Sequence, residues 1–498
     1  MDLGPSFKTD PHFYDFDLNH KYLFFRRTKI VATIGPASSS PKILRQLFEK
    51  GLDVARINFS HGTFPQHAST IRCIRKISKE QSKSVAIIGD LCGPKIRVGE
   101  FPNGSVVLKD KSIVTITTKQ VLGSDVLIPS QYKDIVKDAM VGHSILLDDG
   151  NLELSVLQKK GNTLQARVVH GGVLKNHKGM NLPQTELSAA ALTQKDKEDV
   201  LFCIQNNVDY IALSFVRKAA DIKGLKSFLA HHGSDIPVIA KIEMPQALTN
   251  ICSIVEESDA IMVARGDLGV ELPAKKVPVI QSKLIRIANS MNKPVIVATQ
   301  MLESMISNAR PTRAEVTDVA SACLEGADAV MMSAETASGK FPVEALETMD
   351  SILRETEAFQ FFSKGGRFCD NQRECTNELY DAIGESAAQL SRDLMARSVF
   401  VLTESGYTAR MVSADRPAAP IIALTYSKTI ARRMCLYWGV YPRFVAKPMS
   451  TPGILAYCER ILRDLKLAKK KDYVILITEI RDITVKTVAI MVHTIAEA

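Results

Sequence analysis

The sequence predicts an α/β protein: a (β/α)₈ TIM barrel with an all-β lid domain inserted after strand three and a C-terminal α/β domain. Three observations lead to this prediction. Short apolar strands alternate with helical segments eight times over roughly 230 residues, close to the ~250 residues usual for such a barrel. One glycine-broken stretch inside this region lacks any long helical period. A second, shorter strand–helix alternation follows the eighth unit, as expected for a separate domain.

The first barrel strands are separated by helices with clear start and stop signals. The stretch from Lys29 to Gly35 is predicted to be the first strand. Ser40 and Pro41 form an N-cap and a first helical position, and Gly51 ends that helix. The next elements expected are a strand at 53–59, a helix at 64–81 and a strand at 84–90.

The stretch from about Gly93 to Ser188 predicts an inserted all-β domain, because short alternating segments are broken by glycines there. Its expected strands are at 112–118, 144–147, 152–157 and 164–169. The insert leaves the loop after the third strand, which lies on the active-site face of a barrel of this kind.

The barrel pattern resumes at Thr193, an N-cap with Asp196 three residues further on. Later barrel strands are expected at 209–215, 237–243, 260–264, 294–299 and 329–333, with a helix from Pro311 to Gly326. A polar linker is expected at 363–376, followed by strands at 398–402, 420–424, 473–478 and 485–492. The predicted domains are an N-terminal arm (1–28), the barrel domain (29–92 and 189–358), an inserted β-barrel lid (93–188) and a C-terminal α/β regulatory domain (359–498).

Composition indicates a soluble, cytoplasmic protein. The chain has 498 residues, 46% hydrophobic content and nine cysteines, with no Cys-x-x-Cys pair. The net charge of +9 is spread along the chain, which argues for anionic small substrates and against nucleic acid. Its basic runs, Arg26-Arg27 and 469–471, are interpreted as solvated surface. No membrane span is expected, and the acidic residues within 1–28 fit no targeting signal.

The stretch from Pro237 to Glu243 is predicted to be a buried strand that ends in two charges. Residues two apart in a strand share a face, so Ile239, Lys241 and Glu243 point the same way. A Lys and a carboxylate are costly to bury unless they are used there. A structural ion pair that caps the strand would give the same pattern.

Polar and charged residues also follow the carboxyl ends of the other strands. They are Arg56, Asn58, Ser60, His61, Asp90, Arg265, Asp267, Thr299, Gln300, Ser333 and Glu335, with Gly266 between Arg265 and Asp267. The amino ends are apolar, with Val54, Val85, Val238 and Val295. Because catalytic groups of such barrels lie at the carboxyl ends, this asymmetry predicts a functional rim.

The chemistry of this rim favours a hard divalent cation. Glu243 and Asp267 offer carboxylate oxygens on adjacent strands, which suit Mg²⁺, or Mn²⁺ in its place, better than Zn²⁺. Lys241 could neutralise a transferring phosphoryl group, and a Schiff base is the competing use of such a lysine. The turn at Gly266 and Asp267 could bind a substrate carboxylate through backbone N–H groups.

Taken together and in order, these residues resemble the pyruvate kinase family over nearly the whole chain, most closely in the barrel. The matching stretches are 33–38, 55–62, 90–97, 178–183, 240–243, 262–269, 298–305 and 333–336.

The resemblance implies transfer of a phosphoryl group between phosphoenolpyruvate and ADP, giving pyruvate and ATP. It implies that Lys241 stabilises the transition state and that Glu243 and Asp267 hold Mg²⁺. Gly266, Asp267 and Thr299 would contact the pyruvate moiety, and Thr299 and Ser333 would relay a proton to the enolate. The implied nucleotide or phosphate contacts are Arg56, Asn58, His61, Arg97 and Lys178. The lid would close over the site, and the assembly would be a homotetramer.

One departure from the family concerns a monovalent cation. The family's K⁺ site corresponds to Asn58, Ser60, Asp90 and the carbonyl of Leu91. Members that require K⁺ commonly have a glutamate where this chain has Lys95. The hypothesis is that the Lys95 ammonium replaces K⁺. The alternative is that Lys95 points to solvent and the cation still binds.

A second departure lies in the C-terminal domain. The segment from Thr403 to Thr408 resembles the family's sugar-phosphate effector turn, whose hydroxyls and Gly406 can hold a phosphate. Glu404 adds a negative charge, and 479–484 replaces the usual glycine-rich closing loop. We therefore expect weak or absent activation by fructose 1,6-bisphosphate, while another phosphorylated effector stays open.

Two other functions fit parts of the pattern. A Mg²⁺-dependent pyruvate aldolase or lyase would use a metal-held enolate without a nucleotide. An inactive regulatory subunit would keep the fold without the chemistry. Arg97, Lys178 and the lid-sized insert favour phosphoryl transfer over a lyase, and the complete set of Lys241, Glu243, Asp267 and Thr299 argues against an inactive subunit.

Overall fold

The computed structural model describes residues 25–188, 190–363, 379–446, 450–480 and 487–496. Most of the predicted N-terminal arm, the predicted linker from 364 on and positions 481–484 of the expected closing loop lie outside these residues. The described chain divides into two compact units. One holds the described residues up to Gly89, with 206–210 and the chain from Ile285 on. The other holds 90–205 and 211–284.

Eight parallel strands close into a barrel, in the order β1-β16-β15-β14-β13-β12-β3-β2. This confirms the predicted fold class. Their bounds are β1 (Lys29–Thr33), β2 (Val54–Asn58), β3 (Ala86–Asp90), β12 (Tyr210–Leu213), β13 (Val238–Ile242), β14 (Ala260–Ala264), β15 (Val295–Ala298) and β16 (Ala329–Met332). Nearly every strand residue is buried, which explains why the strands are continuous apolar runs in the sequence.

The barrel helices begin where the chain offers caps. Ser40 Oγ accepts a hydrogen bond from the Ile43 N–H, and Pro41 occupies the first turn of α1 (Pro41–Glu49). Helix α10 (Arg313–Leu324) begins two residues later than predicted, because Thr312 and Glu315 form a capping box. The other helices are α2 (Phe64–Glu80), α4 (Gln194–Gln205), α5 (Ala219–His231), α6 (Pro245–Thr249), α7 (Ile251–Glu257), α8 (Arg265–Glu271), α9 (Val277–Ser290), α11 (Ala334–Ala337) and α12 (Pro342–Ser363), with 3₁₀ turns at Ala274–Lys276 and Glu303–Ile306.

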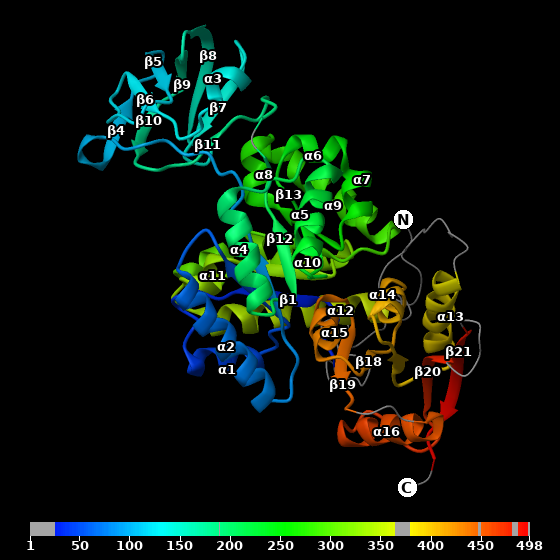
Figure 1. Ribbon diagram of the computed structural model, residues 1–498. Helices are drawn as coiled ribbons and strands as arrows, with labels where there is room; N and C mark the ends of the chain where they lie inside the picture. Colours follow the sequence, from blue (N-terminus) through cyan, green and yellow to red (C-terminus); the bar gives the residue numbers. More distant parts are fainter. Residues whose placement is uncertain (1–24, 189, 364–378, 447–449, 481–486, 497–498) are drawn as a thin grey trace, which may run out of the picture. The chain divides into compact units, whose positions relative to one another are not determined.

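The inserted segment has its own sheets and its own core, and its strands occupy the cyan part of the chain in Figure 1. Six strands follow the order β11-β7-β8-β9-β5-β6, and β10 pairs with β4. They are β4 (Ser105–Leu108), β5 (Ile113–Thr117), β6 (Leu127–Pro129), β7 (Ser144–Leu147), β8 (Leu152–Lys160), β9 (Thr163–His170), β10 (Gly172–Lys175) and β11 (Met180–Asn181), with one short helix, α3 (Ile135–Asp138). Strands β4, β6, β10 and β11 were not predicted, and for β6 and β11 the reason is that two or three residues cannot show an alternating pattern.

The C-terminal domain is a five-stranded sheet in the order β19-β18-β17-β20-β21, parallel except for β21. Its strands are β17 (Val399–Leu402), β18 (Ile421–Thr425), β19 (Val440–Phe444), β20 (Tyr473–Ile480) and β21 (Thr487–Thr494). Helices α13 (Leu379–Asp393) and α14 (Tyr407–Ala414) pack on one face, and α16 (Thr451–Asp464) packs on the other (Figure 1). A short helix, α15 (Lys428–Arg433), precedes β19. Strand β19 was not predicted, because Pro442 and Arg443 interrupt its apolar pattern at the sheet edge.

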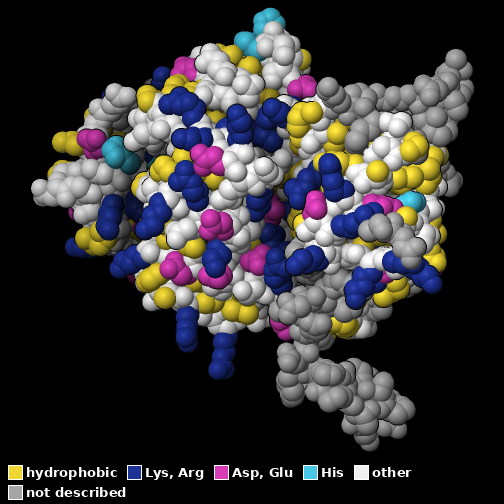
Figure 2. All heavy atoms as spheres, turned by 90° about the horizontal axis from the view of Figure 1, so that it is seen from below, with side chains coloured by type: hydrophobic (Ala, Val, Ile, Leu, Met, Phe, Trp, Pro, Cys, Tyr) yellow, Lys and Arg dark blue, Asp and Glu magenta, His cyan; other side chains and the backbone are white. Residues whose placement is uncertain are grey.

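The two basic runs differ in solvent exposure. Residues 469–471 are exposed as predicted. The interpretation of Arg26 and Arg27 as solvated surface is wrong, since they are 5% and 0% exposed. Arg26 pairs with Asp53 and Asp350, and the Arg27 N–H donates to Glu357. On the face drawn in Figure 2, Lys and Arg side chains are interspersed with Asp and Glu rather than gathered in one patch.

Candidate active site

Lys241, on β13, lies among oxygen atoms at the carboxyl end of its strand. Its Nζ is 2.8 Å from Glu243 Oε1 and 3.2 Å from Asp90 Oδ1, and it donates to Ser214 Oγ at 2.6 Å. Lys241 is 12% exposed and both carboxylates are 1% exposed. The predicted pairing of Lys241 with Glu243 is present. The contact with Asp90 was not foreseen, since Asp90 was considered only as a K⁺ ligand.

Ser214 and Phe215, directly after β12, complete the surroundings of this pair. The Ser214 hydroxyl donates to the Leu91 carbonyl at 2.7 Å, and the Phe215 N–H donates to Glu243 Oε2 at 2.8 Å. Ser214 was not predicted, although a polar residue after a buried strand is the same signal that marks the other strand ends. Ser214 lies at the carboxyl end of the fourth barrel strand, where this signal occurs.

The charges around Glu243 favour a bound cation. Burial is the largest cause and raises the pKa of Glu243, the Lys241 ammonium lowers it, and the Asp267 carboxylate raises it again. Glu243 is buried and Asp267 is half-buried, and the repulsion between the two carboxylates is what a shared cation such as Mg²⁺ would relieve. Among the described residues, no three His, Cys, Asp or Glu side chains are grouped to hold a metal ion, so the predicted pair would be a two-carboxylate site.

Helix α8 carries Asp267 in its first turn and Glu271 at its end. Glu271 is 6% exposed, and one of its oxygens accepts a hydrogen bond from Asn181 Nδ2 at 2.7 Å. Burial raises the pKa of Glu271 to about 7. Both carboxylates line a pocket of about 30 Å³ together with Lys95 and Arg217. Glu271 was not foreseen, because it follows the rim residues by a full helical turn.

The two predicted lid cations lie on neighbouring backbone segments. Arg97 pairs with Gly179 in a β-bridge, and the Val98 N–H donates to the Lys178 carbonyl at 3.0 Å. Lys178 Nζ is 2.7 Å from Asp148 Oδ1, and this hydrogen bond raises the pKa of the Lys178 ammonium. Arg97 Nη1 donates to the His177 carbonyl at 2.9 Å.

The predicted residues of the first compact unit lie in the last half of β2 or follow β2, β15 and β16. Because all strands of the closed barrel are parallel, these ends lie on one rim. Arg56 Nη1 donates to Thr33 Oγ1 at 3.0 Å. Asn58 Oδ1 accepts from the Ser60 N–H, and His61 follows in the same loop.

Thr299 and Ser333 have unusual local geometry. Thr299 has φ of 72°, a region that costs a β-branched residue energy and that recurs at functional sites. The Ser333 N–H donates to Glu335 Oε2 at 2.6 Å, and Glu335 also accepts from the Leu302 N–H. Glu335 therefore ties the loops after β15 and β16 together.

The two departures from the family pattern are visible in part. Lys95 is exposed, and its Cε lies 4.0 Å from the position that a Cβ would occupy on Gly179. In the effector turn, Thr403 Oγ1 accepts from the N–H of Gly406, which has φ of 82° and precedes α14.

Comparisons with known proteins identify the family of both domains. Family models described as the barrel domain and the alpha/beta domain of pyruvate kinase match residues 25–346 and 381–492. The chain is 45% identical over 433 residues to a pyruvate kinase of Geobacillus stearothermophilus, covering 86% of this chain and 73% of that protein. It is 44% identical over 456 residues to pyruvate kinase 2 of a Synechocystis species, covering 91% and 76%.

A crystal structure of a pyruvate kinase from Cryptosporidium parvum superimposes with a TM-score of 0.88 at 34% identity, covering 94% of this chain and 96% of that one. Among the described residues, no helix combines the length and apolar character that a membrane crossing needs. By both its domains, the chain belongs to the pyruvate kinase family.

Proposed function

We propose that this protein transfers the phosphoryl group of phosphoenolpyruvate to ADP, giving pyruvate and ATP. The observation that carries the proposal is the Lys241 ammonium, only 12% exposed, 2.8 Å from Glu243 and 3.2 Å from Asp90, in a chain of the pyruvate kinase family. In a site of low exposure, such an ammonium is held before the substrate arrives and needs no reorganisation during the reaction.

Phosphoryl transfer requires positive charge around the phosphates and little covalent help from the protein. Lys241 stabilises the charge that develops on the transferring group, and Arg56, Arg97 and Lys178 bind phosphate oxygens. Asn58 and His61 contact the nucleotide. Glu243 and Asp267 hold Mg²⁺, or Mn²⁺, which when bound neutralises charge on the substrate oxygens.

The second half of the reaction is protonation of the enolate that is left when the phosphoryl group departs. Gly266, Asp267 and Thr299 hold the pyruvate moiety in this proposal. Thr299 and Ser333 carry the proton to the enolate carbon through their hydroxyls. The strained backbone of Thr299, with φ of 72°, supports a functional role for that hydroxyl.

The lid brings Lys178 and Arg97 to the nucleotide and excludes water when it closes. Lys178 pairs with Asp148 here, so it exchanges that carboxylate for a phosphate oxygen during closure. The domain boundaries for this movement are those predicted above: the barrel at 29–92 and 189–358, the lid at 93–188 and the regulatory domain at 359–498.

K⁺ is not required in this proposal, because the fixed charge of Lys95 replaces it near Asn58, Ser60, Asp90 and Leu91. Asp90 and the Leu91 carbonyl already accept contacts from Lys241 and Ser214, whereas Lys95 is exposed, as in the alternative in which it points to solvent. Turnover is expected to be equal with and without K⁺ at constant ionic strength. A strong K⁺ requirement of the native protein rejects this part.

The proposed assembly is a cytoplasmic homotetramer without nucleic acid or membrane partners. Its C-terminal effector turn binds fructose 1,6-bisphosphate weakly or not at all, because Glu404 repels the phosphate. Strong activation by that sugar would reject the effector proposal, and a dimer in sedimentation would reject the tetramer. Neither result would affect the proposed reaction.

One assay tests the reaction. Phosphoenolpyruvate, ADP and Mg²⁺ are supplied, and pyruvate is followed through lactate dehydrogenase. Lys241→Met is expected to lower kcat by more than about 10²–10³-fold, because it removes the charge that stabilises the transition state. Lys226→Met, a lysine of α5 that pairs with Asp259, is the matched control.

The arms of the assay separate the alternative functions. Pyruvate release that does not depend on ADP would indicate a lyase, and no turnover in any arm would indicate an inactive subunit. Full activity of Lys241→Met would show that the lysine has been assigned the wrong role.

A further inference from the structure

Glu271 forms a bond between the barrel and the lid within the second compact unit. It is the last residue of α8, the helix whose first turn holds Asp267. Its side chain is 6% exposed, and Oε1 accepts from Asn181 Nδ2 at 2.7 Å. Oε2 has no hydrogen-bond partner among the described residues. Burying a carboxylate with a single partner is costly, so the position calls for a functional reason.

Asn181 is the last residue of β11, the lid strand that follows Lys178. Strand β11 pairs with β7 through Met180 and Leu147, and Asp148, the partner of Lys178, follows β7 directly. The Asp148 N–H also donates to the Gly179 carbonyl at 3.0 Å. Fixing Asn181 therefore fixes both Lys178 and the carboxylate that holds it.

The segment between Lys178 and Asn181 is in ordinary contact with its neighbours in the lid. A Cβ on Gly179 would lie 3.8 Å from both Asn181 Oδ1 and Asp149 Oδ1, and 4.0 Å from Lys95 Cε. The Met180 N–H donates to the Ile96 carbonyl at 3.0 Å. Because these backbone hydrogen bonds link 178–181 to its neighbours in the lid, a single side-chain bond to α8 can influence the position of Lys178.

We infer that Glu271 is a positioning residue for phosphoryl transfer, because its hydrogen bond with Asn181 holds the lid segment that carries Lys178 against the helix that carries Asp267. The inference rests on the proposed function, since it assigns Lys178 to the nucleotide phosphates. It predicts that loss of the bond impairs use of ADP much more than use of phosphoenolpyruvate, whose contacts lie on the barrel.

A set of five variants tests the bond itself. Glu271→Ala and Asn181→Ala each remove it, and Glu271→Gln keeps the accepting oxygen. Asn181→Asp replaces the donating amide by a carboxylate, which repels Glu271 when both groups are ionised. The double variant Asn181→Asp with Glu271→Gln reverses donor and acceptor and restores the bond. Gln158→Ala, which removes a hydrogen bond to Gln165 between exposed lid side chains, is the matched control.

The expected kinetic result is a split between the two substrates. Glu271→Ala and Asn181→Ala raise the KM for ADP by about tenfold, the effect of losing one buried hydrogen bond. The KM for phosphoenolpyruvate changes by less than about twofold in the same variants. Glu271→Gln and the double variant behave like the native protein, and Asn181→Asp is the most impaired.

Hydrogen exchange provides a readout that needs no activity. The amides of Asp148 and Met180 should exchange faster in Asn181→Ala and Asn181→Asp than in the native protein, and the double variant should restore protection. If Glu271→Ala fails to fold, the two Asn181 variants and the double variant still decide the question.

Three results would overturn the inference: an unrescued double variant, an equal rise of both KM values, or a Glu271→Gln variant as impaired as Glu271→Ala. A native protein without kinase turnover would reject the proposed function instead. The exchange data would then still show whether Glu271 holds the lid segment.

Discussion

At the scale of single residues, the site depends on how one ammonium is held. Lys241 contacts two carboxylates and the hydroxyl of Ser214. That hydroxyl in turn donates a hydrogen bond to the Leu91 carbonyl. Ser214 is therefore the neutral member that orients Lys241 without changing the charge of the site.

Replacing Ser214 by Ala tests this orientation. The variant Ser214→Ala is expected to lower kcat by about tenfold, because one hydrogen bond to a charged group is lost while both carboxylates remain. The coupled pyruvate assay measures it. The control is Ser253→Ala, which removes an exposed hydroxyl of α7 that donates to the Asn250 carbonyl. An unchanged kcat in Ser214→Ala would show that the carboxylates alone orient the lysine.

At the scale of elements, ionised side chains tie helices to strands in the C-terminal domain. Glu459 of α16 is 8% exposed and lies 2.7 Å from His493 Nε2 on β21. The hydrogen bond with His493 is the largest cause that lowers the pKa of Glu459 below its usual 4.5, and burial opposes it. The Ala496 N–H and Arg463 add to the lowering.

This shift predicts an acid-sensitive contact between α16 and β21. Since the folded pKa is lowered, the ionised carboxylate stabilises the domain above about pH 4.5, and the contribution is lost as the pH falls through the folded value. Glu459→Gln should lower stability by roughly 1–2 kcal/mol at pH 7. The difference from the native protein should vanish in strong acid.

Thermal melting of both proteins across a pH series measures this difference. Glu385→Gln, an exposed glutamate of α13, serves as the control and should melt like the native protein throughout. A difference that stays constant down to pH 2 would contradict the assignment to Glu459 ionisation.

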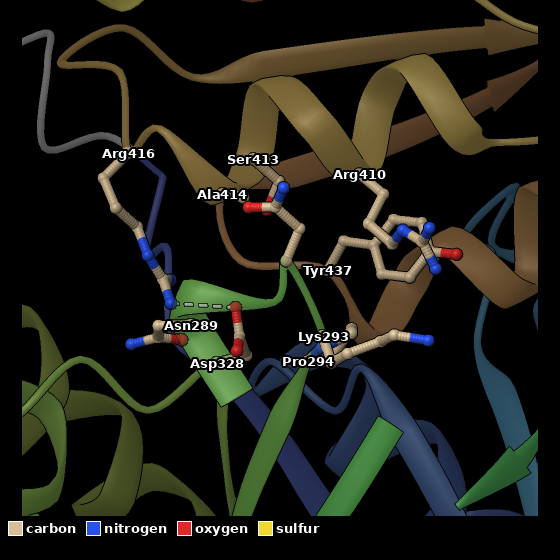
Figure 3. A pocket seen from close by; sticks show the side chains of 10 residues that line it. Asn289, Lys293, Pro294, Asp328, Arg410, Ser413, Ala414, Arg416 and Tyr437 are labelled. Atoms are coloured by element: carbon tan, nitrogen blue, oxygen red, sulfur yellow. Dashed lines mark ion pairs between the residues drawn. The ribbon is translucent and has the colours of Figure 1, made fainter. Parts of the chain in front are cut away.

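At the scale of the whole molecule, buried charged residues at the amino ends of barrel strands contact the C-terminal domain within the first compact unit. Lys29 Nζ donates to the Val440 carbonyl at 2.7 Å. Arg416 lies 2.9 Å from Asp328, the residue before β16, and its guanidinium lies 4.7 Å from the ring centre of Trp438. Figure 3 shows Arg416 reaching toward Asp328 at the edge of a small pocket lined by both domains.

Breaking this pair should destabilise the junction. Arg416 and Asp328 are only 4% and 7% exposed, so Arg416→Ala leaves a buried carboxylate without its cation and should cost about 3–5 kcal/mol. The shift of the urea unfolding midpoint measures it. Arg45→Ala removes an exposed pair with Glu80 and should cost less than about 1 kcal/mol. Equal shifts for the two variants would show that burial does not strengthen the Arg416 pair.

Much of the barrel could be predicted because its signals are local. Buried parallel strands are continuous apolar runs, and caps such as Ser40 and Thr193 mark where helices begin. The rim residues could be found because each follows a strand directly. Strand β19 and the lid strand β11 could not be found, because their pairing depends on neighbours far along the chain.

The sequence by itself determined the eightfold alternation, the position of the lid and the charged strand end at Lys241 and Glu243, since a strand's periodicity and its terminal residues are local properties. Only the tertiary structure decided that Asp90 and Ser214 contact Lys241, that Asn181 reaches Glu271 ninety residues away, and that Arg26 and Arg27 are buried. Such contacts form between segments distant in sequence, and no periodicity records which distant partner will neutralise a given charge.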